Sequence, residues 1–246
     1  MRLLDGIGKF EHRQLILKTL LRRLASVQER IRQAAAEYGR DAQQIRLLAV
    51  SKTRTLEDVL ALASAGQQLF GENYLQEALQ KINASSALAP SIEWHFIGPV
   101  QSNKTRSIAE HFAWVHSVDR LRIAQRLSEQ RSPHLPPLNV CVQVNINDED
   151  AKGGVAPAQA ADLCKAVADL PHLCLRGLMA IPAPSDDIHI QRENFRSLRE
   201  LRDAIMQQGL ELDTLSMGMS NDLEAAIAEG ATIVRIGTDI FGPRII

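Results

Sequence analysis

Eight short apolar runs, separated from one another by helical patterns, constrain the fold of this chain more than any other feature. The first run, residues 46–50, is mostly apolar and is typical of a buried strand. Further strand candidates follow at residues 68–73, 93–98, 114–118, 139–145, 174–180, 214–220 and 232–237. Eight strands that alternate with helices over short links predict an α/β fold, a single (β/α)8 TIM barrel. The 246 residues suit one such barrel.

The segments between these runs carry apolar residues at helical spacing and typical end signals. Predicted helices cover residues 12–38, 55–65, 74–82, 104–111, 119–130, 157–170, 186–208 and 222–229. Thr55, with Asp58 three residues later, is typical of a helix cap, and Gly66 ends that helix.

The first helix carries several arginines, Arg30 among them, which we interpret as its solvated face. Residues 1–11 include Gly6 and Gly8 and show no apolar period. We interpret them as an N-terminal extension, either a mobile tail or a stretch upstream of the true start. The barrel is then one domain, residues 12–246.

Charge and composition exclude several classes of partner and site. Basic and acidic residues number 28 and 29, so nothing favours nucleic acid or a membrane surface. Three cysteines without C-x-x-C spacing predict buried thiols in a reducing compartment, and no disulfide frame. His95, His111 and His116 lack metal-ligand spacing, so we expect no metal. Without a transmembrane run or signal peptide, the expected location is the cytoplasm.

Polar residues gather where the predicted strands end, which is where TIM barrels build their active sites. These positions hold Lys52, Asn73, His95 with Gly98, Asn145, Met179, Ser220, and Arg235 with Gly237 and Thr238. Lys52 lies on a short turn between a core strand and a helix; a solvated loop lysine is the alternative interpretation.

The loops after strands seven and eight of barrels often hold a phosphate group. Ser220 offers a hydroxyl at a helix start, Gly237 permits close approach, and N–H groups near Thr238 can point at phosphate oxygens. A plain helix-capping serine and a plain turn glycine are the alternative interpretations.

A lysine beside a phosphate site suggests a Schiff base with an aldehyde. The aldehyde is either a substrate, as in a barrel aldolase, or pyridoxal phosphate. Arg235 lies two residues before Gly237. If it meets a pyridine nitrogen, that nitrogen stays unprotonated, because arginine does not give up its proton. A weak electron sink of this kind suits a protein that holds the cofactor, or a racemase. A structural ion pair is the alternative interpretation of Arg235.

Several ungapped motifs resemble the pyridoxal phosphate homeostasis proteins. They are LLAVSKT at residues 47–53, FGENYLQE at 70–77, WHFIGPVQSNK at 94–104, LSMGMS at 215–220 and VRIGTDIFG at 234–242. The resemblance implies a single barrel like the N-terminal domain of alanine racemase, the type III fold of pyridoxal phosphate proteins.

The resemblance also implies roles for individual residues. Lys52 would bind pyridoxal phosphate covalently as an internal aldimine, and Asn73 belongs to one of the shared motifs. Three residues match the phosphate positions, namely Ser220, Gly237 and Thr238, and Arg235 matches the contact to the pyridine nitrogen. Lys152 matches a second lysine that accepts or passes on the cofactor, with a solvated loop lysine as the equal alternative.

Alanine racemases add a second, β-rich domain that supplies an acid/base tyrosine. This chain ends at Ile246, and its only tyrosines are Tyr38 and Tyr74. The resemblance therefore implies a monomeric, non-enzymatic carrier that binds, buffers and delivers pyridoxal phosphate to apo-enzymes. It also implies effects on amino-acid and keto-acid metabolism. The alternatives are a pyridoxal-phosphate-dependent amino-acid racemase and a Schiff-base aldolase without a cofactor.

Overall fold

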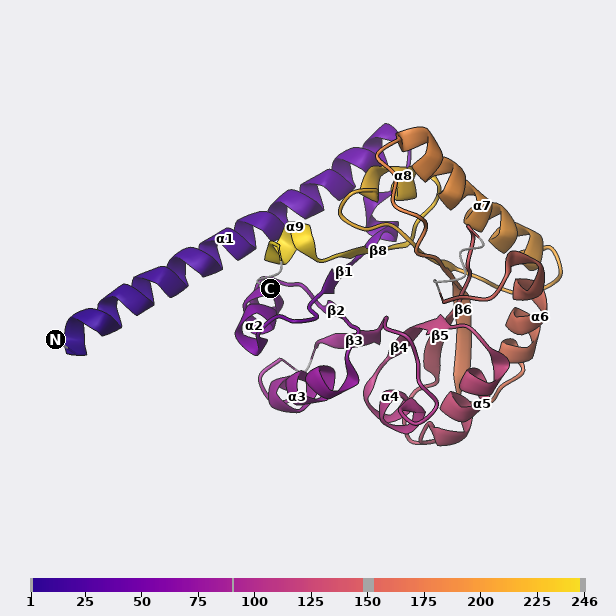
Figure 1. The fold of residues 1–246 in the computed structure, drawn as a ribbon, viewed down its shortest axis with the longest axis horizontal. Coiled ribbons are helices and arrows are strands. Elements are labelled where there is room, and N and C mark those ends of the chain that lie inside the picture. The colour runs from indigo at the N-terminus through magenta and orange to yellow at the C-terminus, as the bar shows by residue number, and fades with distance from the viewer. Residues whose placement is uncertain (1, 90, 148–152, 244–246) are drawn as a thin grey trace.

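Eight parallel strands close into a barrel, in the order in which they occur along the chain (Figure 1). They are β1 (Arg46–Val50), β2 (Leu69–Glu72), β3 (Glu93–Phe96), β4 (Trp114–Val118), β5 (Leu138–Gln143), β6 (Leu173–Met179), β7 (Thr214–Ser216) and β8 (Ile233–Ile236). β1 pairs with β8, with Leu47 opposite Val234, and so completes the ring. This computed structural model describes residues 2–89, 91–147 and 153–243, with side chains from residue 13 onward. The predicted TIM barrel is confirmed.

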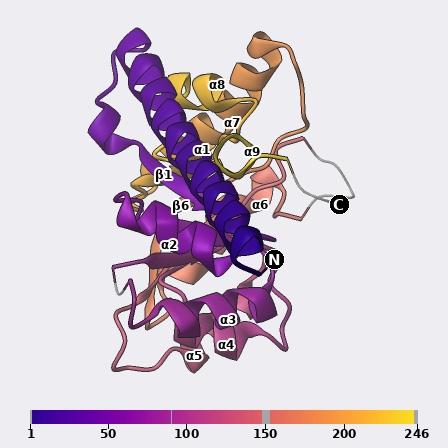
Figure 2. The same cartoon turned by 90° about the vertical axis from the view of Figure 1, so that its left-hand side faces the viewer.

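Helices surround the ring of strands (Figure 1). They are α1 (Arg2–Glu37), α2 (Leu56–Ser64), α3 (Leu75–Ser85), α4 (Thr105–His111), α5 (Leu121–Gln130), α6 (Pro157–Ala168), α7 (Ile188–Met206), α8 (Leu223–Ala228) and α9 (Thr238–Phe241), with a 3-10 turn, η1 (Ala42–Gln44). The last helix, α9, has only four residues, and the long helix α1 covers the barrel wall beside β1 and β8. It contacts α2, α8 and α9 there (Figure 2).

The start of α1 differs from the sequence prediction. The helix begins at Arg2, so the predicted start near residue 12 is wrong. A glycine inside a helix costs only about 1 kcal/mol relative to alanine, so Gly6 and Gly8 weaken the helix without ending it. The N-terminal end of α1 extends past the barrel (Figure 1). The division of the chain into residues 1–11 and 12–246 stays a prediction, and α1 runs unbroken across that boundary.

Trp114 fills the amino end of the barrel. The guanidinium groups of Arg46 and Arg176 lie 5.1 and 5.3 Å from the centre of its ring system, and His95 stacks on it at 5.3 Å. These contacts bury a large apolar ring under cationic groups, an arrangement that cation–π attraction favours. The carboxyl end of the barrel is left for the site.

The remaining sequence expectations concern cysteines, metals and membranes. Cys141 and Cys164 are buried, and burial raises the pKa of both thiols, whereas Cys174 is half-buried. In residues 2–89, 91–147 and 153–243, no group of His, Cys, Asp or Glu side chains is arranged to hold a metal ion. Within the same ranges, no helix combines the length and the apolar character needed to span a bilayer.

Candidate functional site

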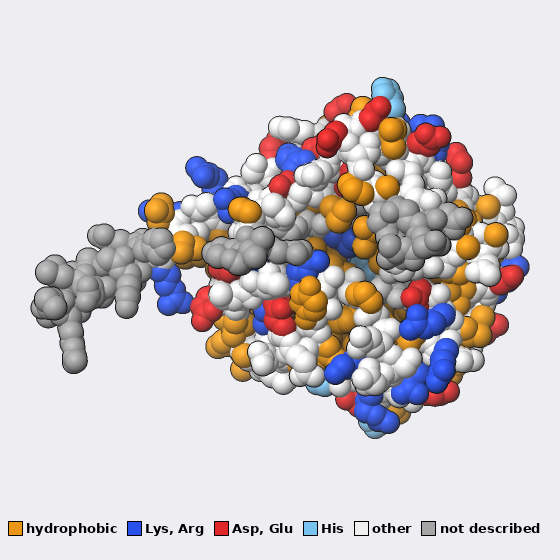
Figure 3. All heavy atoms as spheres, viewed as in Figure 1, with side chains coloured by type: hydrophobic (Ala, Val, Ile, Leu, Met, Phe, Trp, Pro, Cys, Tyr) orange, Lys and Arg blue, Asp and Glu red, His pale blue; other side chains and the backbone are white. Residues whose placement is uncertain are grey.

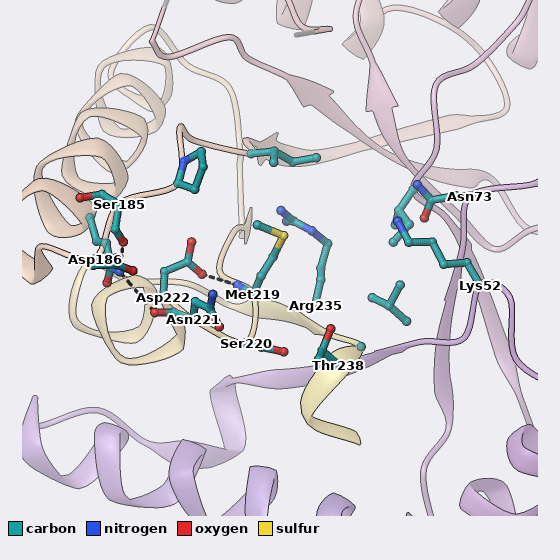
Figure 4. A pocket seen from close by; sticks show the side chains of 16 residues that line it. Lys52, Asn73, Ser185, Asp186, Met219, Ser220, Asn221, Asp222, Arg235 and Thr238 are labelled. Atoms are coloured by element: carbon teal, nitrogen blue, oxygen red, sulfur yellow. Dashed lines mark hydrogen bonds between the residues drawn. The ribbon is translucent and has the colours of Figure 1, made fainter. Parts of the chain in front are cut away.

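A cavity of about 320 Å³ opens at the carboxyl end of the barrel. Six predicted site residues line it, namely Lys52, Asn73, Ser220, Arg235, Gly237 and Thr238. Lys52 and Asn73 lie on one side of the cavity, and Arg235, Ser220 and Thr238 lie across from them (Figure 4). Hydrophobic side chains gather round the middle of this face of the molecule (Figure 3). Lys152 falls outside the residues that the structure describes.

Lys52 belongs to a tight turn between β1 and α2. The N–H of Arg54 donates to the carbonyl of Ser51 at 3.1 Å, which closes the turn. The hydroxyl oxygen of Thr55 then accepts the N–H of Asp58 at 3.2 Å, so the predicted helix cap is confirmed. A buried strand and a capped helix thus fix the two ends of the turn, and the lysine side chain points into the cavity (Figure 4).

Asn73 directly follows β2 and is held close to the loop after β3. A Cβ atom on Gly98 would lie 2.3 Å from the carbonyl oxygen of Asn73, so only glycine permits this approach. The side-chain oxygen Oδ1 of Asn73 is buried and has no hydrogen-bond partner among the described residues. Burial of an unpaired acceptor is costly, so this atom is available to a donor on a ligand.

Arg235 projects from β8 and is 4% exposed. Its Nη1 donates to the hydroxyl of Ser216 at 2.8 Å, and its Nη2 donates to the carbonyl of Ala180 at 2.9 Å. These partners are not the carboxylate that a structural ion pair requires. Burial lowers the pKa of Arg235 to about 10, so the guanidinium remains charged at neutral pH.

A chain of hydrogen bonds runs through the barrel interior behind Arg235. Ser216 Oγ lies 2.7 Å from His116 Nδ1, and His116 Nε2 lies 2.8 Å from His95 Nδ1. His95 Nε2 lies 2.9 Å from a carboxylate oxygen of Glu93. Burial lowers the pKa of His95 to about 4 and that of His116 well below its usual value, so both rings are neutral near pH 7.

The groups at the two ends of this series of hydrogen bonds determine which group donates in each bond. A guanidinium can only donate and an ionised carboxylate can only accept. With neutral imidazoles between them, Ser216 donates to His116, His116 to His95, and His95 to Glu93. Each buried ring nitrogen therefore has a partner, and Arg235 is held in one orientation.

The loops after β7 and β8 lie side by side at the other end of the cavity. The N–H of Asp239 donates to the hydroxyl of Ser220 across a long 3.4 Å contact. Arg30 of α1 connects both loops: its Nη2 donates to the Ser220 carbonyl at 3.1 Å, and its other nitrogens pair with Asp239 and Glu224. The interpretation of Arg30 as merely solvated is therefore wrong, because its partners come from distant loops.

Gly237 lines the cavity without a structural requirement for glycine. Its φ of −115° is open to any residue, and the three atoms nearest to an added Cβ all belong to Val50, at 3.4 Å or more. Gly218 differs, because its φ is +93° and its Cβ would lie 2.5 Å from that of Ala226. Folding thus requires glycine at 218, whereas at 237 its absent side chain leaves space on the cavity wall.

Other strand-end residues named from the sequence do not line the cavity. Met179 is fully buried in the barrel, and neither Asn145 nor His95 is a lining residue. Sequence reasoning missed one wall, which consists of Ile181, Pro184, Ser185, Asp186 and Gln191. The one indication of this wall in the sequence was its position after the sixth strand.

Comparison with known proteins places the chain in a family. The model of the alanine racemase N-terminal domain matches residues 23–244. The pyridoxal phosphate homeostasis protein of Pseudomonas aeruginosa is 58% identical over 228 residues, which cover 93% of this chain and 97% of the relative. The chain belongs to the pyridoxal phosphate homeostasis protein family.

Solved structures agree with this family assignment. PipY of Synechococcus elongatus PCC7942, solved with PLP bound, is 34% identical, has a TM-score of 0.79, and matches 91% of this chain and 100% of its own. The alanine racemase of Corynebacterium glutamicum is 17% identical, with a TM-score of 0.68 over 94% of this chain and 62% of its own. The racemase likeness shows the fold alone.

Proposed function

We propose that the chain binds pyridoxal 5'-phosphate in this cavity and holds it for delivery, without turnover. One observation carries the proposal. A lysine amine, a buried guanidinium and two adjoining loops with hydroxyl and backbone N–H donors, all from separate elements, line the same 320 Å³ cavity. Membership in the homeostasis family and the PLP-bound state of PipY support the same ligand.

Two features of the cavity fit this ligand. Asn73 Oδ1 is a buried acceptor without a partner among the described residues, which suits a ligand that carries a hydroxyl donor. Gly237 leaves open space at the cavity wall. Neither its backbone conformation nor its packing requires a glycine at this position. The charges also fit, because a phosphate ester is anionic and Arg235 is a cation among the cavity-lining side chains.

Each residue has a role that follows from its chemistry. Pyridoxal phosphate supplies an aldehyde, a pyridine nitrogen and a phosphate. Lys52 provides the amine, which condenses with an aldehyde and releases one water. Ser220, Gly237 and Thr238 hold the phosphate through a hydroxyl and N–H groups. Arg235 meets the pyridine nitrogen and keeps it unprotonated, because an arginine donates a hydrogen bond and retains its proton.

The cavity lining includes two carboxylates, Asp186 and Asp222, but neither of the two tyrosines. A racemase needs proton donors and acceptors on opposite faces of a substrate carbon. Neither Tyr38 nor Tyr74 lines the cavity. Asp222 does line it, but its carboxylate accepts the N–H of Met219. We therefore infer a carrier that acts as a cytoplasmic monomer and passes its cofactor to apo-enzymes, with Lys152 taking part in transfer.

The test is covalent trapping at Lys52. We expect the purified chain, mixed with pyridoxal phosphate and then borohydride, to gain one phosphopyridoxyl group on Lys52 in peptide mass spectra. The Lys52→Ala variant loses this adduct completely, whereas Lys104→Ala, which alters a lysine outside the cavity, keeps it. A chain without the adduct contradicts the proposal, and a colourless protein that instead forms borohydride-trapped adducts with substrate aldehydes supports the aldolase alternative.

Turnover separates the carrier from the racemase. Incubation of the loaded protein with single-enantiomer amino acids is expected to yield less than one equivalent of the opposite enantiomer. More than one equivalent contradicts the carrier and supports the racemase. Transfer of the cofactor to an apo-enzyme, followed by the recovered activity of that enzyme, then measures delivery directly.

A further inference from the structure

A buried ion triad lies directly behind the turn that carries Lys52. The ammonium Nζ of Lys81 is 2.8 Å from a carboxylate oxygen of Glu72 and 2.6 Å from one of Glu77. The Lys81 side chain is 6% exposed and that of Glu72 is 0% exposed. Glu72 ends β2, whereas Glu77 and Lys81 lie one turn apart on α3. None of the three lines the cavity, so the triad is separate from the groups that would touch a ligand.

Hydrogen bonds from the triad hold the backbone on both sides of Lys52. Lys81 Nζ donates to the carbonyl of Ser51 at 2.7 Å, and the Ser51 hydroxyl donates to Glu72 at 2.7 Å. On the other side, the backbone N–H of Thr53 donates to Glu77 at 2.6 Å. These bonds hold residues 51 and 53 through charged groups, and such hydrogen bonds are stronger than neutral ones.

Thr53 adopts a backbone conformation that threonine disfavours. Its φ is +63°, in the left-handed region, where a β-branched side chain is strained and glycine is usual. The residue therefore stays in this conformation only while its surroundings hold it. Its N–H is bonded to Glu77, and the turn is closed at the Ser51 carbonyl, which also accepts from Lys81.

We propose that Glu72, Lys81 and Glu77 are positioning residues for Lys52. They hold the strained turn, so that the lysine leaves β1 with its side chain directed into the cavity rather than toward solvent. Without them the turn relaxes, Thr53 moves to negative φ, and the amine spends less time beside Arg235 and the phosphate loops. The inference rests on the proposed function, since it assigns Lys52 the role of cofactor-binding amine.

The experiment compares variants that keep or remove the hydrogen bond to Thr53. Glu77→Ala removes the acceptor, whereas Glu77→Gln retains an oxygen that can accept from the Thr53 N–H. We expect Glu77→Ala to slow borohydride trapping of pyridoxal phosphate at Lys52 about tenfold, as the loss of a hydrogen bond to a charged group implies, and Glu77→Gln to slow it less. Lys81→Met should slow trapping at least as much.

Relief of strain provides a rescue that a purely structural role would not give. Glycine tolerates positive φ without cost, so Thr53→Gly in the Glu77→Ala background should restore most of the trapping rate. Two readouts do not involve the cofactor. They are the hydrogen-exchange protection of the Thr53 amide and the rate at which trinitrobenzenesulfonate modifies Lys52. Both should change in Glu77→Ala. In the double variant the modification rate of Lys52 should return toward its original value, whereas the amide of residue 53 stays unprotected because its acceptor is still missing.

A second ion cluster, formed around a buried carboxylate, serves as the matched control. Glu229 is 1% exposed and pairs with Arg192, Arg196 and Arg199 at 2.8, 3.4 and 2.8 Å, and none of these residues lines the cavity. Glu229→Gln should lower the melting temperature without changing trapping or modification at Lys52.

The outcomes separate the two proposals. Absence of an adduct in the unaltered chain contradicts the proposed function, whereas an altered trinitrobenzenesulfonate rate in Glu77→Ala would still support positioning. An adduct whose rate is unchanged in Glu77→Ala and Lys81→Met, or is equally slowed by Glu229→Gln, contradicts the positioning role. If Lys81→Met does not fold, Glu77→Ala alone decides, because Glu77 is 27% exposed and more tolerant of change.

Discussion

Ion pairs support both ends of the cavity, but the two sets of ion pairs differ in how deeply they are buried. At the lysine end, the turn after β1 depends on Glu72 and Lys81, whose side chains are 0% and 6% exposed. At the other end, where we propose that the phosphate binds (the phosphate end), the loops after β7 and β8 depend on Arg30, whose side chain is 31% exposed and whose partners Glu224 and Asp239 are 40% and 31% exposed. The first support is deep in the protein, and the second is in partial contact with water.

This difference has consequences for stability. Removing one member of a buried ion pair leaves an uncompensated charge, whereas an exposed pair is weakened by water and screened by salt. The lysine end is therefore expected to be rigid and insensitive to ionic strength. The phosphate end is expected to be easier to open, which is consistent with the ligand release that the proposed delivery requires.

The largest effect is expected when the buried support loses its cation. Lys81→Met should lower the free energy of unfolding by about 3–5 kcal/mol, since the buried carboxyl group of Glu72 loses the cation that compensates it. For a chain of this size that corresponds to a fall in melting temperature of roughly 6–20 °C, measurable by calorimetry. A fall no larger than that of Arg30→Met would remove the distinction between the two ends.

Acid should weaken the support behind Arg235. His95 has a folded-state pKa of about 4 against its ordinary 6.5, so the unfolded chain binds more protons between these values. The free energy of unfolding should therefore fall as the pH drops from 6.5 to 4, by about 3 kcal/mol from this group. Below pH 4 this contribution falls no further.

Denaturant titrations across this pH range measure the acid effect, and one variant isolates it. His116→Gln interrupts the chain of hydrogen bonds at His95 and should change the slope. Glu72 acts in the opposite sense, because burial raises its pKa and acid then favours its folded form. A slope that His116→Gln leaves unaltered would contradict the assignment of neutral rings.

The exposed support should give a smaller, salt-dependent effect. Arg30→Met is expected to cost about 1 kcal/mol at low ionic strength, because all three side chains are in partial contact with water. The loss should shrink in 1 M salt, whereas that of Lys81→Met should not. Equal salt dependence of the two variants, measured by thermal unfolding, would argue against the comparison.

The smallest effect on folding is expected at Gly237. The three atoms nearest to an alanine Cβ there belong to Val50 and lie at 3.4 Å or more, so Gly237→Ala should change the free energy of unfolding by less than about 0.5 kcal/mol. The affinity of the Gly237→Ala variant for pyridoxal phosphate, measured by fluorescence titration, should nevertheless fall, because the added methyl group narrows the phosphate end of the cavity. A large loss of stability with unchanged affinity would show that the glycine serves folding instead.

Much of this architecture could be predicted from the sequence because it is local. Runs such as residues 46–50 and 114–118 mark strands by apolar content, and the cap at Thr55 is formed by residues three positions apart. The site residues were found by their place at strand ends. Since all strands of a parallel barrel point the same way, their carboxyl ends share one rim.

The sequence did not predict the supports of these residues. Arg30 and Asp239 are 209 positions apart, and His116 and Ser216 are 100 positions apart, so no periodicity links them. Most of the missed cavity wall, residues 181–186, lies in an irregular segment that carries no period, although Gln191 lies on α7.

The sequence by itself determined that strands and helices alternate eight times. It also determined that Lys52, Arg235 and the loops with Ser220 and Gly237 lie at the carboxyl ends of strands, on one rim of the barrel. Only the tertiary structure decided which charges are buried behind that rim and which remain in contact with water. Local pattern depends on neighbours in the chain, whereas the strength of a charge pair depends on how much water the assembled protein excludes around it.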